Sequence, residues 1–157
     1  MIRLLFVCMG NICRSPTAEG VMRGLLREEG LEDVVEVDSA GTGDWHAGDA
    51  PDVRATAAAA ARGVTLAGAA REITTADFGD YDLVLAADRR NLHELEAMLP
   101  AGARAKLHLL RAFDPEAADL DVPDPYYGGD AGFEHVLDLV EAACRGLLDA
   151  LRADGRL

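Results

Sequence analysis

Short apolar runs alternate along this chain with longer segments in which apolar residues recur at helical spacing. The apolar runs predict β-strands at residues 2–7, 34–38, 82–87 and 106–110. The helical spacing, limited by glycine or proline, predicts α-helices at residues 15–30, 51–62, 90–99 and 132–152. Strands that alternate with helices favour a parallel sheet covered on both faces. We therefore predict a three-layer α/β/α fold of the flavodoxin-like or Rossmann-like type, with a central four-stranded parallel sheet.

Two segments of the chain are expected to be functional loops. Residues 113–130 form a long loop rich in proline, aspartate, glycine and tyrosine, and loops of this length are uncommon in compact domains unless they serve a function. A glycine-rich loop after the second strand carries Trp45 and His46. The chain of 157 residues shows no internal repeat, and its length suits a single domain spanning residues 1–157.

Composition narrows the possible partners and the compartment. Half of the residues are hydrophobic and the formal net charge is −13, so neither nucleic acid nor an anionic membrane is an expected partner. A local cradle could still bind a small anion against this global field. The apolar run at residues 1–7 is too short for a signal peptide or a membrane span. With three cysteines and no export signal, we expect a cytoplasmic protein without a disulfide framework.

The segment Cys-Met-Gly-Asn-Ile-Cys-Arg-Ser at residues 8–15 carries the most specific chemical signal. It follows a strand and opens a helix, which is where open parallel sheets bind ligands and where backbone N–H groups can surround an anion. Gly10 permits a tight turn. Arg14 can present its guanidinium fork to two phosphate oxygens, and it would favour the thiolate of Cys8. A buried, inert Cys8 is the competing interpretation, but the strand, glycine, serine and helix around it favour a reactive thiol and a phosphate-binding loop after the first strand.

Three motifs, in order, resemble those of the low-molecular-weight protein tyrosine phosphatases. They are Cys-Met-Gly-Asn-Ile-Cys-Arg-Ser-Pro at residues 8–16, Val-Asp-Ser-Ala-Gly-Thr at 37–42 and Asp-Pro-Tyr-Tyr-Gly at 124–128. The resemblance runs from the first strand to the last helix. It implies that Cys8 attacks phosphorus and forms a phosphocysteine, that Arg14 holds the phosphate oxygens, and that Asp124 is the general acid and base. Without the resemblance, Asp124 would only predict a turn, and we rank Asp114, Asp119 and Asp121 below it.

The same resemblance assigns the residues that bind phosphate and those that support them. The implied phosphate-binding loop consists of Met9, Gly10, Asn11, Ile12, Cys13, Arg14 and Ser15. Asn11 and Ser39 would hold its shape, and Ser15 would donate its hydroxyl to the Cys8 sulfur, a role compatible with capping the helix. Many family members add a histidine to this polar network, but residues 66–72 contain none. The firmness of the loop is therefore an open point.

The resemblance also implies a substrate cleft and a possible redox partner. The cleft would be formed by Ile12, Trp45, Tyr126 and Tyr127, with Trp45 and Tyr126 as walls that flank an aromatic ring. The competing interpretation of Trp45 is simple surface packing. Cys13 could form a reversible disulfide with Cys8, or it could only pack beneath the loop. The four histidines, His46 among them, are expected at the surface or in packing contacts.

We accordingly predict a protein tyrosine phosphatase that acts on phosphotyrosine in proteins, is inhibited by inorganic phosphate or other oxyanions, and needs no metal or organic cofactor. Three alternatives stay open. An arsenate reductase of the same fold needs further resolving cysteines, and none lies between Cys13 and Cys144. A protein arginine phosphatase would carry threonine at the position of Ile12. A non-catalytic phosphate-binding module would not need Cys8, Arg14 and Asp124 together.

Overall fold

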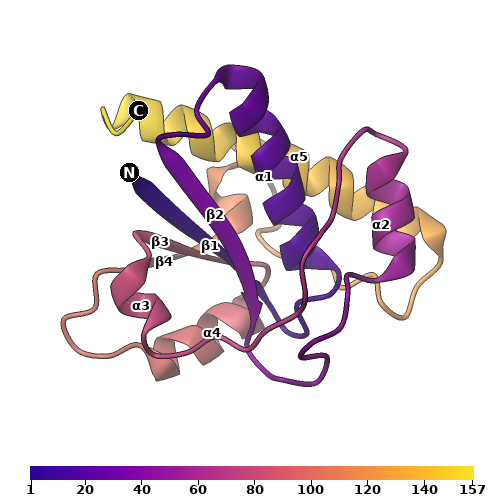
Figure 1. The fold of residues 1–157 in the computed structure, drawn as a ribbon, viewed down its shortest axis with the longest axis horizontal. Coiled ribbons are helices and arrows are strands. Elements are labelled where there is room, and N and C mark those ends of the chain that lie inside the picture. Colours follow the sequence, from indigo (N-terminus) through magenta and orange to yellow (C-terminus); the bar gives the residue numbers. More distant parts are fainter.

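Four parallel strands form the centre of the computed structural model, which describes residues 1–157 (Figure 1). The strands are β1 (Ile2–Cys8), β2 (Val35–Gly41), β3 (Leu83–Ala86) and β4 (Lys106–Leu109), and their order in the sheet is β2-β1-β3-β4. Every neighbouring pair is parallel. The predicted four-stranded parallel sheet is thus confirmed.

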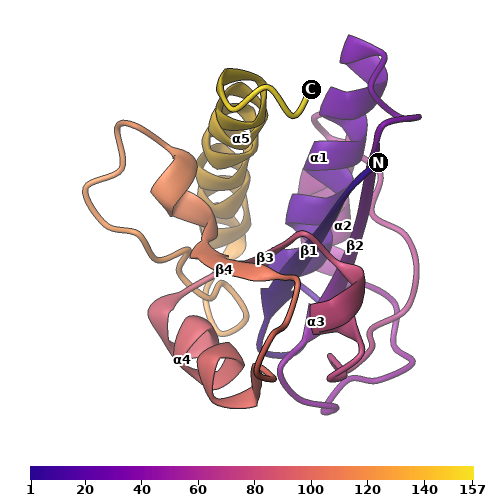
Figure 2. The same ribbon diagram turned by 90° about the vertical axis from the view of Figure 1, so that its left-hand side faces the viewer.

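Helices cover both faces of this sheet, as Figure 2 shows. The helices α1 (Arg14–Glu29), α2 (Val53–Ala60) and α5 (Asp130–Ala153) lie on one face, and α3 (Asp77–Asp80) and α4 (Arg89–Met98) lie on the other. The central strand β1 supplies both cores: Leu4 and Phe6 pack with α1 and α5, whereas Leu5 and Val7 pack on the side of α4. A strand buried on both faces explains why its sequence is a continuous apolar run.

The pairing register of the sheet places the carboxyl ends of β1, β2 and β3 side by side. Cys8 pairs with Gly41, and Val7 pairs with both Ala40 and Ala86. The loops that leave the carboxyl ends of β1, β2 and β3 therefore start at the same edge of the sheet, which is the edge where ligands bind in this class of fold.

The element boundaries differ from the sequence predictions at several points. β2 continues beyond residue 38 to Gly41 because it pairs with β1 along its whole length. α2 is shorter than predicted at both ends: it begins at Val53, because the side chain of Asp52 caps it by accepting from the N–H groups of Arg54 and Ala55, and it ends at Ala60. α3 and the 3₁₀ helix η1 (Leu110–Phe113) were not predicted. The segment from residue 114 to 129 contains no helix or strand, as expected.

None of the helices combines the length and the apolar character that crossing a membrane requires. The longest, α5, buries one face against α1 and η1. The contact with η1 is so close that a Cβ added at Gly146 would lie 1.9 Å from the carbonyl oxygen of Phe113. Gly146 therefore sets the distance between α5 and η1.

Gly146→Ala is expected to destabilise the protein by about 1–3 kcal/mol, because overpacking forces the backbone of η1 to move. Gly24→Ala is the matched control, since a Cβ at Gly24 of α1 meets nothing within 4 Å. It should stabilise the protein by about 0.5–1 kcal/mol through helix propensity. Urea unfolding of both variants measures the difference. Equal stabilisation by the two substitutions would contradict the close approach of α5 to η1.

Candidate active site

The loop between β1 and α1 presents a row of free backbone donors. No backbone N–H from Met9 to Arg14 donates a hydrogen bond to another group of the protein. Carbonyl groups before and within this stretch are held from outside: that of Cys8 accepts from the N–H of Thr42 (2.9 Å), and that of Ile12 accepts from the N–H of Asp52 (2.8 Å). With its carbonyls tied to neighbouring segments and its donors free at a helix N-terminus, this loop can bind an anion.

The thiol of Cys8 lies at the start of this loop. Its sulfur is 3.0 Å from the hydroxyl oxygen of Ser15. The Ser15 oxygen also accepts from the amide of Asn11 (2.8 Å), and its distance to the carbonyl of Ala40 is 3.5 Å. Because the carbonyl is the more distant acceptor, the Ser15 hydroxyl is well placed to donate its proton to the sulfur.

Asn11 supports the loop from behind. It is the one non-glycine residue with a positive φ (58°), a conformation that asparagine tolerates better than most residues. Its amide donates to Ser15 and to Ser39 (3.0 Å), and its side-chain carbonyl accepts from the N–H of Arg71 (3.0 Å). The side-chain amide thus makes three hydrogen bonds at once, which hold the left-handed turn in place.

The network ends on a carboxylate. Ser39 donates to Glu19 (2.7 Å), and the other oxygen of Glu19 accepts from Nε of Arg23 (3.0 Å). Arg23 also donates to the carbonyl of Val37 (2.7 Å). Sequence reasoning missed Glu19, although it lies one helical turn after Ser15 and therefore on the same face of α1. Charged partners on α1 complete the network without a histidine.

Arg14 is held in place although only 4% of its side chain is exposed. Its Nη1 donates to the carboxylate of Asp88 (2.6 Å) and to the carbonyl of Val122 (3.0 Å), and its Nη2 lies 3.7 Å from the carboxylate of Asp124. Burial alone would lower the pKa of Arg14, but the neighbouring Cys8, Asp88 and Asp124 raise it, and the net direction is upward. Arg14 is therefore a buried, permanent cation.

Asp88 is a second residue that sequence reasoning missed. It follows β3 at the carboxyl edge of the sheet and also caps α4, where it accepts from the N–H of Asn91 (2.7 Å). A capping aspartate at this edge was visible in the sequence. Its partner Arg14 is far away in the chain, so the sequence alone did not reveal the pairing.

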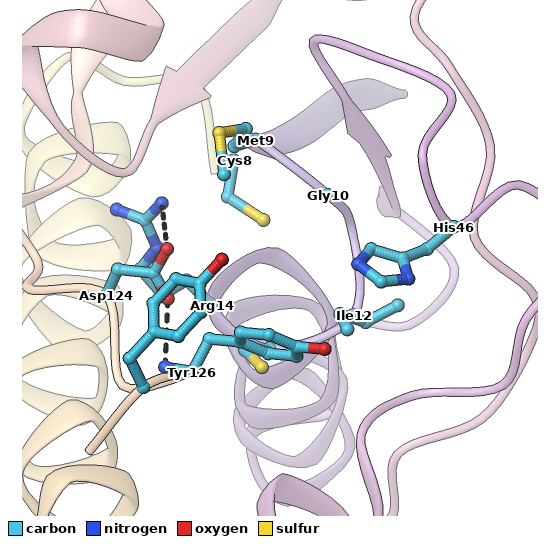
Figure 3. A pocket seen from close by; sticks show the side chains of 10 residues that line it. Cys8, Met9, Gly10, Ile12, Arg14, His46, Asp124 and Tyr126 are labelled. Atoms are coloured by element: carbon cyan, nitrogen blue, oxygen red, sulfur yellow. Dashed lines mark hydrogen bonds and ion pairs between the residues drawn. The ribbon is translucent and has the colours of Figure 1, made fainter.

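A small cavity of about 60 Å³ lies in front of the loop, and Figure 3 shows the side chains around it. Most of the predicted site residues line it: Cys8, Met9, Gly10, Ile12, Cys13, Arg14, Asp124, Tyr126 and Tyr127. The supporting residues Asn11, Ser15 and Ser39 lie outside its lining. The thiol, the guanidinium and the carboxylate implied by the sequence therefore meet at one cavity.

Trp45 does not line this cavity, so its predicted position in the cleft is corrected. Its side chain is 66% exposed and folds over Gly43, where an added Cβ would clash with the indole ring. The neighbouring His46 lines the cavity instead, with its ring 5.9 Å from that of Tyr126. His46 had been expected at the surface or in packing. The loop thus turns His46 toward the cavity and leaves the neighbouring Trp45 at the surface.

All three cysteines are buried and unpaired. Burial raises the pKa of the Cys13 thiol to about 12, and it also raises the pKa of the Cys144 thiol. Cys144 lies in the core between α5 and α1, as expected. The disulfide between Cys8 and Cys13 stays a prediction.

The strand–loop–helix site at the edge of a four-stranded parallel sheet defines an α/β protein with an anion-binding type of loop beside a thiol. The family model described as low molecular weight phosphotyrosine protein phosphatase matches residues 3–157. A low molecular weight protein-tyrosine-phosphatase from Streptomyces coelicolor is 51% identical over 153 residues, which cover 96% of this chain and 93% of that protein. The chain belongs to the low molecular weight phosphotyrosine protein phosphatase family.

Solved structures agree with this assignment. The crystal structure of a protein tyrosine phosphatase from Entamoeba histolytica, with Hepes in its active site, superposes with a TM-score of 0.94 at 37% identity and full coverage of both chains. An arginine phosphatase from Drosophila superposes with a TM-score of 0.92 at 33% identity, over 98% of this chain and 99% of that one. The fold is thus shared by phosphatases that are named for different phosphorylated side chains.

Ser39→Ala is expected to lower the free energy of unfolding by about 1–3 kcal/mol, because it leaves an Asn11 N–H and an oxygen of Glu19 without partners. It should also weaken the binding of inorganic phosphate. Thr42→Val, directly after β2, is the matched control, since the buried hydroxyl of Thr42 has no hydrogen-bond partner. The control should be neutral or stabilising. Urea unfolding and calorimetric titration with phosphate compare the two, and equal effects would argue against a supporting network.

Proposed function

We propose that this chain hydrolyses phosphotyrosine in proteins through a phosphocysteine intermediate, with residues 1–157 acting as one catalytic unit. One observation carries the proposal: the Cys8 thiol, the buried guanidinium of Arg14 and the Asp124 carboxylate line the same cavity, in front of a loop whose N–H groups have no partner in the protein (Figure 3). Hydrolysis of a phosphate monoester can use each of these groups: a nucleophile, donors that bind the phosphate oxygens, and a general acid. Members of the family to which the chain belongs are named for this activity.

Binding comes first. The donors from Met9 to Arg14 would meet the phosphate oxygens, together with one edge of the Arg14 guanidinium. Asp88 and Val122 occupy Nη1 of Arg14, which leaves Nε and Nη2 for two oxygens of the substrate. Because the guanidinium is already positioned, little further ordering is needed when the anion binds.

The chemistry then proceeds in two steps. In the first, the Cys8 sulfur attacks phosphorus, the P–O bond to the tyrosine oxygen breaks, and Asp124 gives its proton to that oxygen. In the second, Asp124 takes a proton from water, the water oxygen attacks phosphorus, and the S–P bond breaks to release inorganic phosphate. The Ser15 hydroxyl, 3.0 Å from the sulfur, stabilises the thiolate each time it is the attacking or leaving group.

The walls of the cavity favour an aromatic phosphate ester. Ile12 supplies an apolar surface beside the phosphate loop, and the rings of His46 and Tyr126 face the cavity. A flat ring can pack between such surfaces. The reaction requires a reduced Cys8, so we place it in a reducing compartment such as the cytoplasm.

The first test compares substrates and variants. The wild type is expected to hydrolyse p-nitrophenyl phosphate and a phosphotyrosine peptide, and to act poorly on a phosphoarginine peptide of the same sequence. Cys8→Ser should abolish all hydrolysis because it removes the nucleophile. Cys144→Ser, which changes a cysteine in the core away from the site, should retain activity. Full activity of Cys8→Ser would refute the mechanism, and a preference for phosphoarginine would assign the protein to the other specificity.

The second test concerns the proton donor. Asp124→Asn is expected to slow hydrolysis of phosphotyrosine by about 10²–10⁴-fold, the usual contribution of a general acid. The loss should be smaller for p-nitrophenyl phosphate, whose leaving group is more acidic and needs less protonation. Asp121→Asn, a change in the same loop outside the cavity lining, is the control and should have a far smaller effect. Equal losses for both substrates would show that Asp124 does not protonate the leaving group.

A further inference from the structure

A second, larger hollow lies beside the candidate active site, between α2 and the first turn of α5. Figure 1 shows these two elements next to one another. The hollow is an open groove of about 520 Å³. It shares no lining residue with the phosphate cavity, and the chemistry proposed above does not use it.

One wall of the groove is an exposed apolar stripe. Val53, Ala57 and Ala61 recur at four-residue intervals, so they lie on one face of α2 and its end. Val53 is 81% exposed, and both alanines are exposed as well. Phe133 of α5 is buried at the bottom. The groove thus offers one apolar wall and an aromatic floor to a ligand.

The groove and the phosphate cavity are joined through Arg54 and Tyr126. Arg54 lines the groove, donates to the carbonyl of Tyr126 (2.9 Å) and lies over the rings of Tyr126 (5.6 Å) and Phe133 (4.7 Å). Tyr126 in turn lines the phosphate cavity. At the start of α2, the N–H of Asp52 donates to the carbonyl of Ile12 in the phosphate loop. The groove therefore adjoins the phosphate cavity, with Arg54 and Tyr126 at the border between them.

Of the charged residues that line the groove, the one without an ion pair is negative. Asp130, the first residue of α5, is exposed and makes no ion pair. Glu134, in contrast, is paired with Arg62 (2.7 Å). The cation that lines the groove, Arg54, is itself paired with Asp52 (3.1 Å). The unpaired carboxylate of Asp130 therefore offers a partner for a basic side chain.

We propose that this groove is a substrate subsite for the polypeptide segment next to the phosphotyrosine. A small or branched apolar side chain of the substrate packs on the stripe of Val53, Ala57 and Ala61, and a neighbouring lysine or arginine pairs with Asp130. The inference rests on the proposed function, since the phosphotyrosine anchors the segment. It adds a sequence preference that a phosphate cavity alone does not give.

The test uses two phosphotyrosine peptides, and p-nitrophenyl phosphate as a substrate that cannot reach the groove. In the first peptide, the phosphotyrosine is flanked on each side by a valine and a lysine. In the second peptide, serine replaces each valine and glutamine replaces each lysine. The wild type should show a higher kcat/KM for the first peptide. Ala57→Gln, which fills the groove without adding charge, should lower that value about fivefold, mainly through KM, because a small apolar contact is lost. Asp130→Asn should reduce the advantage given by lysine.

Two controls separate the subsite from other effects. Ala60→Gln makes the same substitution at an exposed position of α2 outside the groove, and it should leave both peptides unaffected. Hydrolysis of p-nitrophenyl phosphate should be unchanged in Ala57→Gln, Asp130→Asn and Ala60→Gln alike.

Several results would overturn the inference. If the wild type hydrolyses p-nitrophenyl phosphate but does not distinguish the peptides, or if Ala57→Gln has no effect on either, the subsite is refuted while the proposed function stands. If Ala57→Gln converts a dimer into a monomer in sedimentation, the groove binds a second copy of the chain instead. If the wild type hydrolyses no aryl phosphate, the proposed function fails, and the subsite fails with it.

Discussion

The site depends on one constraint: the N–H groups of the phosphate loop must stay free of internal partners while the loop keeps a single shape. A buried donor without a partner costs about 1–3 kcal/mol, so a loop left to itself would turn these groups toward other acceptors. Here the carbonyl side of the loop is held by Thr42 and Asp52, and the turn at Asn11 is held by three side-chain hydrogen bonds. The donors are thereby kept ready for an anion, and the stability of the surrounding sheet and helices supports them.

A strongly acidic protein can bind phosphate here because the local charge differs from the global one. The net charge is −13, but the cavity combines a helix N-terminus, free amides and the buried guanidinium of Arg14. Asp88 keeps that guanidinium in place without occupying all its donors. A short-range arrangement of fixed dipoles and one cation can outweigh a diffuse surface charge, since water and salt screen the exposed carboxylates far more than the buried groups.

Much of the fold and the chemistry could be predicted from the sequence because both depend on local patterns. The apolar run at residues 2–7 and the segment that follows it define β1, the loop and the start of α1 within a single stretch of chain. The features that the sequence did not predict depend on contacts between residues far apart in the chain. Asp88 and Glu19 act through partners that only the folded chain brings together, and the exchange between Trp45 and His46 depends on how one loop packs against Gly10 and Tyr126. Strand order likewise follows from sheet pairing, which no single motif specifies.

The loop that carries Asp124 shows how the parts of the site are coupled. It has no regular structure, and it is tied to the sheet where the N–H of Val122 donates to the carbonyl of Ala87 (2.7 Å) and where the carbonyl of Val122 accepts from Arg14. Asp124 then lies 3.7 Å from the same guanidinium and accepts from the N–H of Tyr126 (3.0 Å). Arg14 thus lines the cavity and also holds the loop that carries Asp124. The Asp124 side chain is 35% exposed, so in the proposed mechanism water can reach it for the second step once the phenol has left.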